Sequence, residues 1–307
     1  MKEFILFGKG FEKVESWQDG CWINMHNPSA GDLNYLKELN VPKSFISDIQ
    51  DVDERPRTES DGDWRLTILR LPRETNDVDI PYSTIPLGII TNNKLVIVLS
   101  FFNNPVVNDF IQYNKNKGVN INNRLTLILR LIMSSAVWFL KFLKQINVNI
   151  NAAEDDLERK LRNEDLLKMR NLQKSLVYFN TGIRGNESLL MRLKSLYQNS
   201  GLLDTDMVED VHIELQQALN SVNIYSNILS GTMEAFGSII SNNLNQIMKR
   251  MTSITIILQV PTLIASLYGM NVRLPHEEQP WAFVAIIATS ILLSASAFFL
   301  FKKIKWF

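Results

Sequence analysis

Two long runs without a charged side chain, near the C-terminal end of the sequence, constrain this chain more than any other feature. They extend over Met251–Val272 and Trp281–Phe301, about 22 and about 21 residues. A helix needs about 20 apolar residues to cross the hydrocarbon core of a bilayer, so both runs are long enough. The alternative is a hydrophobic hairpin buried in a soluble core, but two such runs at the end of a charged chain are hard to bury. We therefore predict two transmembrane helices, at about 251–271 and 281–301.

Basic residues lie next to both runs and predict the orientation of the chain. They are Lys249, Arg250, Lys302, Lys303 and Lys305, the last three in a basic tail at 302–307. The predicted outer loop, 272–280, carries one arginine and the glutamates Glu277 and Glu278. Because basic residues collect on the cytoplasmic side, both termini are predicted to be cytoplasmic, in the cell (plasma or inner) membrane. The two glutamates either concentrate cations by their field or are simply solvated.

The charge balance and the rare residue types exclude several classes of function. Lys+Arg and Asp+Glu are equal at 32 each, whereas a general nucleic-acid binder needs a basic excess. The only cysteine, Cys21, excludes a disulfide within the chain, and the histidines are isolated in sequence. The chain has neither a glycine-rich phosphate loop nor a nucleophile motif. We expect no enzyme activity and no organic cofactor, so any transport is passive.

Residues 1–104 have the composition of a mixed α/β domain. The strand-like segments are FILFG (4–8), CWINM, WRLTILRL (64–71) and KLVIVLS (94–100). AGDLNYLKELN (30–40) is typical of a short helix. Prolines from Pro28 to Pro86 are interpreted as breaks between these elements.

Residues 105–250 have the character of a stalk of long helices, because no proline follows Pro105 until Pro261. We predict helices at about 123–161 and 163–197, followed by a break at Asn199-Ser200-Gly201.

A third helix is predicted to begin near Asp204, whose carboxylate suits an N-cap. Nothing obvious ends it before the first membrane run, although Gly231 and Gly237 leave open a separate bundle joined to the membrane by a turn. The predicted fold is thus an α+β cytoplasmic domain with a long helical stalk, followed by a transmembrane domain at 251–307.

A stripe of mostly small or polar residues follows one face of the third helix into the first membrane run. Its members are spaced alternately by four and three: Glu234, Ser238, Ser241, Asn245, Met248, Thr252, Thr255, Gln259, Thr262 and Ser266. This is one helix face at the heptad period. Such a face can line water, but one helix cannot enclose a path, so a pore requires several copies of the chain. The stripe fits equally well with hydroxyls that bond across a helix pair. Met248 and Met251 could form an apolar constriction.

The end of the first membrane run, Tyr268-Gly269-Met270-Asn271, resembles the Gly-Met-Asn signature of the CorA family of magnesium transporters. The run NQIMKRMTSITIILQVPTLIASLYGMN (245–271) is similar to the family's pore helix throughout. Weaker similarity covers CWINMHNP (21–28) and ERPRTESDGDWRLTILRLP (54–72). Ser266 replaces a common glycine, and Gln259 occupies a position that is often apolar.

The resemblance implies a homopentameric funnel that carries Mg²⁺, and also cobalt or nickel ions, through the membrane. The stalk helices of the five copies continue into an inner ring, and the second spans form an outer ring around it. Gly269, Met270 and Asn271 would form the selectivity filter. The expected partners are further copies of the chain, membrane lipid and divalent cations.

The resemblance also implies that cytosolic Mg²⁺ holds the channel closed from a site between neighbouring subunits. Asp210 matches the acid on the stalk helix, and Asp206 and Glu214 share its helix face. The partner on the α/β domain would fall near Asp77. The alternative for these acids is an ordinary solvated face. Two other functions remain open: a zinc transporter of the same fold, and a membrane-anchored sensor or scaffold that conducts nothing.

Overall fold

The computed structural model describes residues 2–8, 10–119, 121, 123–160, 163–271 and 279–306. The chain forms two compact units, Met1–Thr232 and Met233–Phe307. The boundaries at 104 and 250, which divide the chain into the α/β domain, the stalk and the transmembrane domain, remain predictions.

A seven-stranded sheet forms the centre of the first unit. Its strands are β1 (Lys2–Leu6), β2 (Lys13–Val14), β3 (Cys21–His26), β4 (Arg57–Asp61), β5 (Trp64–Glu74), β6 (Tyr82–Thr91) and β7 (Val96–Ser100). The spatial order is β2-β1-β3-β7-β6-β5-β4, and only β3 and β7 pair in parallel. The four strands expected from composition are present, whereas β2, β4 and β6 were not predicted.

The interpretation of every proline as a break was wrong in two places, since Pro72 lies in β5 and Pro86 in β6. Pro86 pairs with Arg70 of β5, but the pairing of β6 with β7 covers only Gly88–Thr91. Pro72 likewise lies beyond the part of β5 that pairs with β4. A proline is tolerated in a strand where one side is an open edge, because its missing N–H then removes no ladder bond.

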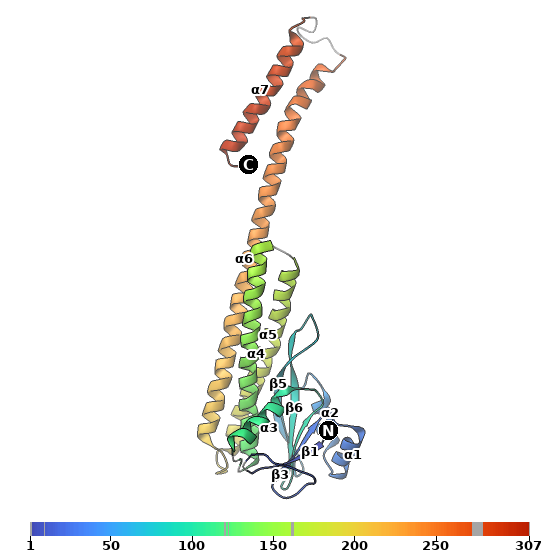
Figure 1. Cartoon of the computed structure of the whole chain (residues 1–307), viewed down its shortest axis with the longest axis vertical. Coiled ribbons are helices and arrows are strands. Elements are labelled where there is room, and N and C mark those ends of the chain that lie inside the picture. Colours follow the sequence, from blue (N-terminus) through green and yellow to red (C-terminus); the bar gives the residue numbers. More distant parts are fainter. Residues whose placement is uncertain are drawn as a thin grey trace. The chain divides into compact units, whose positions relative to one another are not determined.

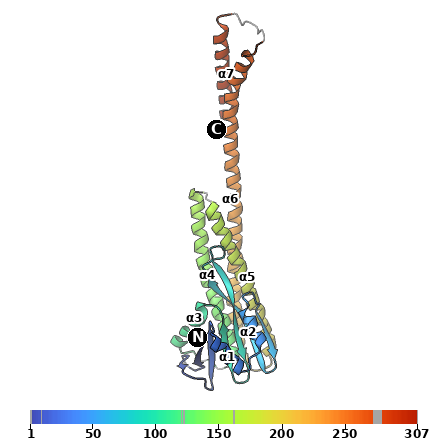
Figure 2. The ribbon, with the colours of Figure 1, turned by 90° about the vertical axis from the view of Figure 1, so that its right-hand side faces the viewer.

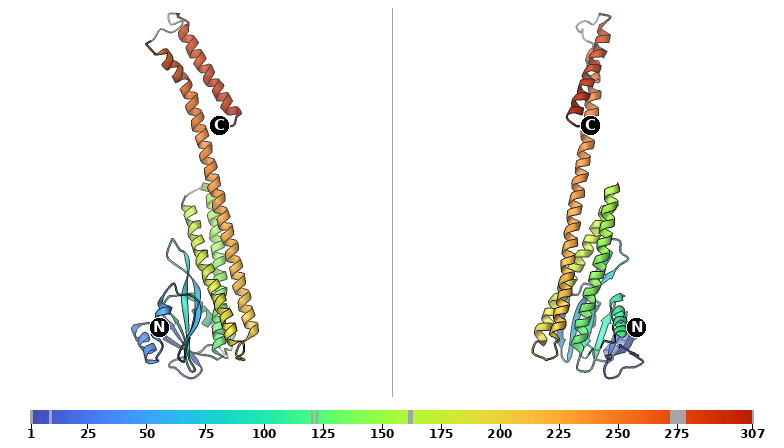
Figure 3. Two further views of the ribbon diagram at one scale, coloured as in Figure 1. Left: turned by 180° about the vertical axis from the view of Figure 1, so that it is seen from behind. Right: turned by 60° about the vertical axis from the view of Figure 1, so that its left-hand side comes forward.

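Helices cover both faces of the sheet. On one face, α1 (Ala30–Glu38) and α2 (Lys43–Gln50) bury Leu36, Phe45 and Ile49 against β3, β5, β6 and β7. On the other, α4 (Arg124–Lys160) and α5 (Asn163–Tyr197) lie along the sheet (Figures 1 and 3). The helix α3 (Pro105–Lys117) lies beside α4 (Figure 2). The bounds of α4 and α5 agree with the two predicted helices, whereas α2 and α3 were not predicted.

The predicted third helix is α6, which runs without interruption over Thr205–Tyr268 and passes through Gly231 and Gly237. The Asp204 carboxylate accepts the N–H of Met207 at 3.0 Å and so caps the first turn, as expected. In the first unit, α6 buries an apolar stripe of heptad spacing that includes Val208, Val211, Leu215, Ala218 and Val222.

Arg70 forms a buried polar junction between the sheet and its surroundings. Its guanidinium donates to the carbonyl oxygens of Val52 (2.5 Å), Glu54 (3.0 Å) and Thr84 (2.7 Å). The side chain of Asn186 on α5 accepts the Arg70 N–H at 2.7 Å and donates to the Arg70 carbonyl at 2.8 Å. Burial lowers the pKa of Arg70 from its ordinary value. These bonds hold β5, β6, α5 and the loop before β4 in one arrangement.

The second unit contains the C-terminal part of α6 and the antiparallel α7 (Ala282–Lys303) (Figure 1). Pro261 has no N–H, so the carbonyl of Ile257 loses its helical donor. The hydroxyl of Ser294 on α7 donates to that carbonyl at 3.4 Å. A serine on a neighbouring helix is a common replacement for a bond that a proline removes in a membrane helix. The proline therefore helps to fix which face of α6 meets α7.

We predict that Gly185→Ala destabilises the first unit. A Cβ at Gly185 would lie 2.6 Å from Cγ and 2.8 Å from Cδ of Pro56, and the proline ring cannot rotate away. Overpacking of this kind costs about 1–3 kcal/mol. The matched control is Gly231→Ala on α6, where a Cβ meets nothing within 4 Å of the same chain. The control should be neutral or stabilise by up to about 1 kcal/mol. Thermal unfolding of the purified full-length protein measures both, and equal midpoints would contradict the close contact.

Candidate functional site

Three helices in the described part of the chain are long and apolar enough to cross a membrane: segment Arg124–Asp155 of α4, α6 and α7. Burial separates them. The apolar window of α4 is 61% buried inside the structure, whereas those of α6 and α7 are each 6% buried. The apolar side chains of α4 therefore belong to the core of the first unit. The side chains in the apolar windows of α6 and α7 have no comparable cover within one chain.

Every member of the predicted stripe that lies in the second unit is exposed. They are Glu234, Ser238, Ser241, Asn245, Met248, Thr252, Thr255, Gln259, Thr262 and Ser266, and Met251 beside them is exposed as well. Between Met251 and Tyr268 the least exposed positions follow another face, with Ser253 buried and Ile257, Val260, Pro261 and Ile264 half-buried. At about 100° per residue, the two faces lie on opposite sides of α6.

The half-buried face of α6 is the one that meets α7. Ile257, Pro261 and Tyr268 line an apolar groove of about 860 Å³ together with residues of α7 such as Ser290 and Ser294. The polar stripe therefore points away from the partner helix of its own chain. The sequence left two interpretations of the stripe open, a water-lined face and hydroxyl bonds across a helix pair. The second does not apply to the pair of α6 and α7.

Two threonine hydroxyls of the stripe, those of Thr255 and Thr262, donate to the backbone of their own helix. Thr255 donates to the carbonyl of Met251 at 2.8 Å, and Thr262 donates to that of Leu258 at 3.0 Å. A hydroxyl that donates to its own helix keeps oxygen lone pairs for other partners. These two threonines therefore present hydrogen-bond acceptors on the stripe, and the water molecules around a hydrated cation are donors.

The Gly-Met-Asn sequence follows directly after the end of α6, and Gly269, Met270 and Asn271 are all exposed. The N–H of Gly269 still donates to the Ala265 carbonyl at 2.9 Å. A Cβ at Gly269 would lie 3.2 Å from that carbonyl oxygen, which is closer than most Cβ contacts. The glycine thus allows a close approach of backbone atoms at the helix end. Glu277 and Glu278 lie outside the described residues.

The acidic residues near the start of α6 lie together with an aspartate that the sequence analysis missed. Asp206 and Asp210 line a cavity of about 510 Å³ with Asp204 and with Asp109 of α3. Asp109 accepts the indole N–H of Trp138 at 2.9 Å. Asp109 precedes Asp210 by about a hundred residues, so no local spacing pointed to it. Glu214 is half-buried and does not line this cavity.

Asp77 does not join these acids within one chain. It lies in the β5–β6 turn, where Asn171 of α5 donates to the neighbouring Val78 carbonyl at 3.0 Å. Gln173, two residues further along α5, donates to Ser230 of α6 at 3.1 Å. Ser230 and Asp210 are about 30 Å apart along the helix axis. Among the described residues of one chain, no three His, Cys, Asp or Glu side chains form a metal-binding group.

Comparisons with known proteins agree on one family. The family model described as CorA-like Mg²⁺ transporter protein matches residues 17–303. The cobalt/magnesium transport protein CorA of Methanocaldococcus jannaschii is 27% identical over 303 residues, 93% of this chain and 90% of the relative. The protein of the same name from Thermotoga maritima is 24% identical over 296 residues, 93% of this chain and 83% of the relative.

Solved structures agree on the fold. The complete structure of the CorA magnesium transporter from M. jannaschii has a TM-score of 0.85 at 23% identity and covers 100% of this chain and 99% of its own. The cytoplasmic domain of ZntB from Vibrio parahaemolyticus has a TM-score of 0.60 at 15% identity and covers 78% of this chain and 96% of its own. At these identities the likeness shows the fold alone.

We predict that water reaches the stripe in the membrane-embedded protein. A cysteine at Thr255 or Gln259 should react with a charged, water-soluble methanethiosulfonate reagent, because thiolate formation needs water. A cysteine at the neighbouring Leu258 is the matched control and should react much more slowly, since its face is apolar. Cys21 is buried, so the background is low. The measurement is mass spectrometry after labelling in liposomes, and equal rates at 255, 258 and 259 would contradict a wet stripe.

Proposed function

The chain belongs to the CorA-like Mg²⁺ transporter family, as its motifs predicted, and from this premise we propose that it forms a homopentameric channel for Mg²⁺. Co²⁺ and Ni²⁺ are further cargo. Transport is passive, and both termini lie in the cytoplasm. An inward membrane potential favours entry by about 2.3 kcal/mol per charge per 100 mV, which doubles for a divalent ion.

One observation carries the proposal: the acceptor-rich stripe of α6 is fully exposed on the side opposite α7. A polar face of this length is unfavourable against lipid. Turned toward a common axis, the stripes of several chains enclose water, while α7 and the apolar flanks of α6 face lipid and neighbouring helices. This arrangement makes α6 the inner helix and α7 the outer one.

Exposed apolar residues on the first unit support assembly of several copies. Ile213, Ile224 and Ile228 of α6 are 55%, 55% and 43% exposed, and Val137 and Val148 of α4 are 50% and 64% exposed. Large apolar side chains that recur along long helices are typical of surfaces that bind a partner. We propose that these surfaces form the contacts between subunits, and that the acidic residues near the start of α6 lie at the same contacts.

Asn271 is the proposed filter residue because of the chemistry of Mg²⁺, which gives up its water shell reluctantly. A ring of amide oxygens accepts hydrogen bonds from that shell without removing it. The C-terminal end of α6, just before Asn271, adds the negative end of the helix dipole. Wide, neutral acceptors therefore suit the hydrated ion better than a tight carboxylate cage.

We predict that Asn271→Ala abolishes selective Mg²⁺ uptake while assembly remains intact. The substitution removes the amide oxygen at the proposed filter and leaves both membrane helices unchanged. Liposomes loaded with a Mg²⁺ indicator measure uptake, and native mass spectrometry in mild detergent measures the number of subunits. Asn199→Ala, at an exposed loop position, is the matched control and should behave as wild type.

Normal uptake and ion preference in Asn271→Ala would refute the filter. A conducting monomer or dimer would refute the pore. The same liposomes with Zn²⁺ and its own indicator separate a magnesium channel from a zinc transporter. Absence of any ion flux in wild type would favour a scaffold.

The acids at the start of α6 support regulation by cytosolic Mg²⁺. Asp204, Asp206, Asp210 and Asp109 line one cavity with a single arginine, Arg130. Carboxylates crowded together repel one another unless a cation lies between them. We propose that Mg²⁺ at this face holds neighbouring subunits in the closed state. Asp77 and Glu214 are proposed as further acids of the contact, contributed by neighbouring subunits.

We predict that Asp210→Ala raises the cytosolic Mg²⁺ concentration needed to close the channel, because a lost carboxylate weakens cation binding. Glu209→Ala is the matched control: it removes the same charge one residue earlier, on another face of α6, and should leave the closing concentration unchanged. Mg²⁺ current and protease protection of the first unit, each measured against cytosolic Mg²⁺, test this. Superimposable curves for wild type and Asp210→Ala would make Asp210 an ordinary surface charge.

A further inference from the structure

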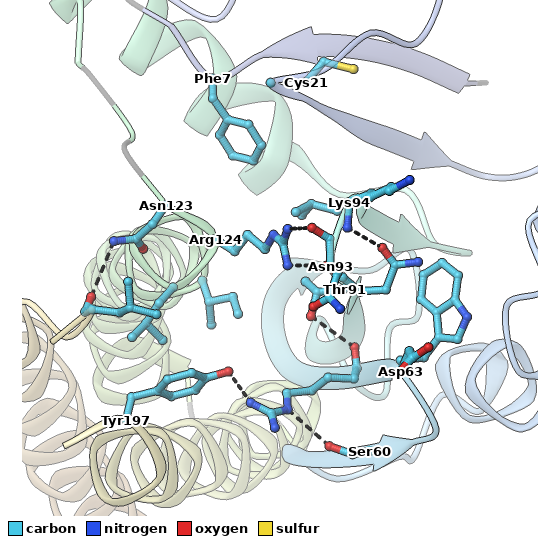
Figure 4. A pocket seen from close by; sticks show the side chains of 18 of the residues that line it. Phe7, Cys21, Ser60, Asp63, Thr91, Asn93, Lys94, Asn123, Arg124 and Tyr197 are labelled. Carbon is cyan, nitrogen blue, oxygen red and sulfur yellow. Dashed lines mark hydrogen bonds between the residues drawn. The ribbon is translucent and has the colours of Figure 1, made fainter. Parts of the chain in front are cut away.

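A second cavity of the first unit, about 660 Å³ in volume, has no part in the proposed ion path (Figure 4). It lies where the β4–β5 and β6–β7 turns meet the start of α4 and the end of α5. Its charged lining residues are Arg65, Lys94, Arg124 and Asp63, so its net charge is positive in a chain whose total charge is zero. In the described part of the chain, none of the three basic side chains forms a salt bridge.

One wall of the cavity is built around Arg65 of β5. Its guanidinium donates to the hydroxyl of Tyr197 and, at 3.2 Å, to the hydroxyl of Ser60 (Figure 4). It also lies over the Tyr197 ring, 5.4 Å from the centroid. Both hydroxyls accept from Arg65, so their own hydrogen atoms remain available to donate. This wall therefore offers a fixed cation flanked by two hydroxyl donors.

Another wall is formed by Arg124 and the first turn of α4. Arg124 donates to the carbonyls of Asn92 and Asn93, which fixes the turn between β6 and β7 (Figure 4). Asn123 accepts the N–H of Thr126 at 2.8 Å and so caps the helix. The first turn of a helix leaves N–H groups without helical partners and carries a partial positive charge. No acidic residue lies in this turn to neutralise it.

We propose that this cavity binds a small phosphorylated molecule. Phosphate oxygens are strong acceptors and match a guanidinium, an ammonium, hydroxyl donors and a helix N-terminus. The cavity holds all four, and its volume falls in the range of small-molecule sites. Arg65 and Lys94 carry the charge that the ligand contacts, while Arg124 holds the turn in place. The proposal does not depend on the channel assignment.

The test is calorimetric titration of the full-length protein with ATP and with inorganic pyrophosphate, in buffer freed of Mg²⁺ by EDTA. Removal of Mg²⁺ prevents the ligands from acting by chelation. Wild type should bind at least one of the two with a saturable heat, and the affinity should fall as ionic strength rises. Arg65→Gln should weaken binding at least tenfold, because it removes charge-assisted hydrogen bonds. Tyr197→Phe, which keeps the ring below Arg65, should weaken it by a smaller factor.

Lys94→Gln keeps the test decisive if Arg65→Gln does not fold, because Lys94 is exposed and its side chain forms no hydrogen bond or ion pair within the described chain. It should weaken binding severalfold. Lys194→Gln is the matched control, an exposed lysine of α5 near Tyr197 that does not line the cavity. Absence of saturable binding in wild type would overturn the proposal. Equal losses in Lys94→Gln and Lys194→Gln would do so as well, as would binding of citrate in place of both phosphates.

Discussion

Between Thr252 and Ser266, α6 is apolar on three sides and polar on the fourth. The polar side chains of the fourth side need hydrogen-bond partners that the helix itself supplies only in part. Thr255 and Thr262 meet part of the need by donating to their own backbone, which makes the face tolerable in a membrane protein. What remains is a row of acceptor oxygens that neither lipid nor α7 can satisfy. Water or another protein chain is the partner that suits this face, and the proposed inner position of α6 and the proposed assembly of several copies both depend on this.

Pro261 helps to fix which face of α6 meets α7 and which face stays free. It deprives the Ile257 carbonyl of its helical donor, and Ser294 of α7 donates to that carbonyl instead. Ser290 and Ser294 of α7 line the groove between the two helices at this level. Because the groove side of α6 is fixed in this way, the stripe on the opposite side is left without a partner. A local backbone defect thus orients the surface that we propose conducts ions.

The helical parts of the fold could be predicted from the sequence because their signals are local. The break at 199–201 marks the end of α5, and the cap at Asp204 marks the start of α6, each within a residue or two. The sheet was harder, because Pro72 and Pro86 are acceptable only where a neighbouring strand has already ended. That depends on the lengths of β4 and β7, which pair from elsewhere in the chain.

The candidate site divides in the same way. The spacing of the stripe and the Gly-Met-Asn sequence are local patterns, and the sequence displays them directly. The direction of the stripe relative to α7 depends on a bond between two helices, which no periodicity reveals. Asp109 joins Asp206 and Asp210 only because α3 packs beside α4, and Arg65 and Arg124 line one cavity only through the sheet turns between them.

The zero net charge of the chain conceals two regions of opposite sign in the first unit. One cavity collects four aspartates with Arg130, and the other collects Arg65, Lys94 and Arg124 with a single aspartate. Folding that gathers like charges opposes itself by Coulomb repulsion, and water screens the repulsion only in part. An ion of opposite charge relieves it and so binds the folded state better than the unfolded one. A cluster of like charges in the folded chain therefore indicates the charge of a bound ligand better than the total charge of the chain does. The acidic one suits a cation that bridges subunits, and the basic one suits a small anion within a single chain.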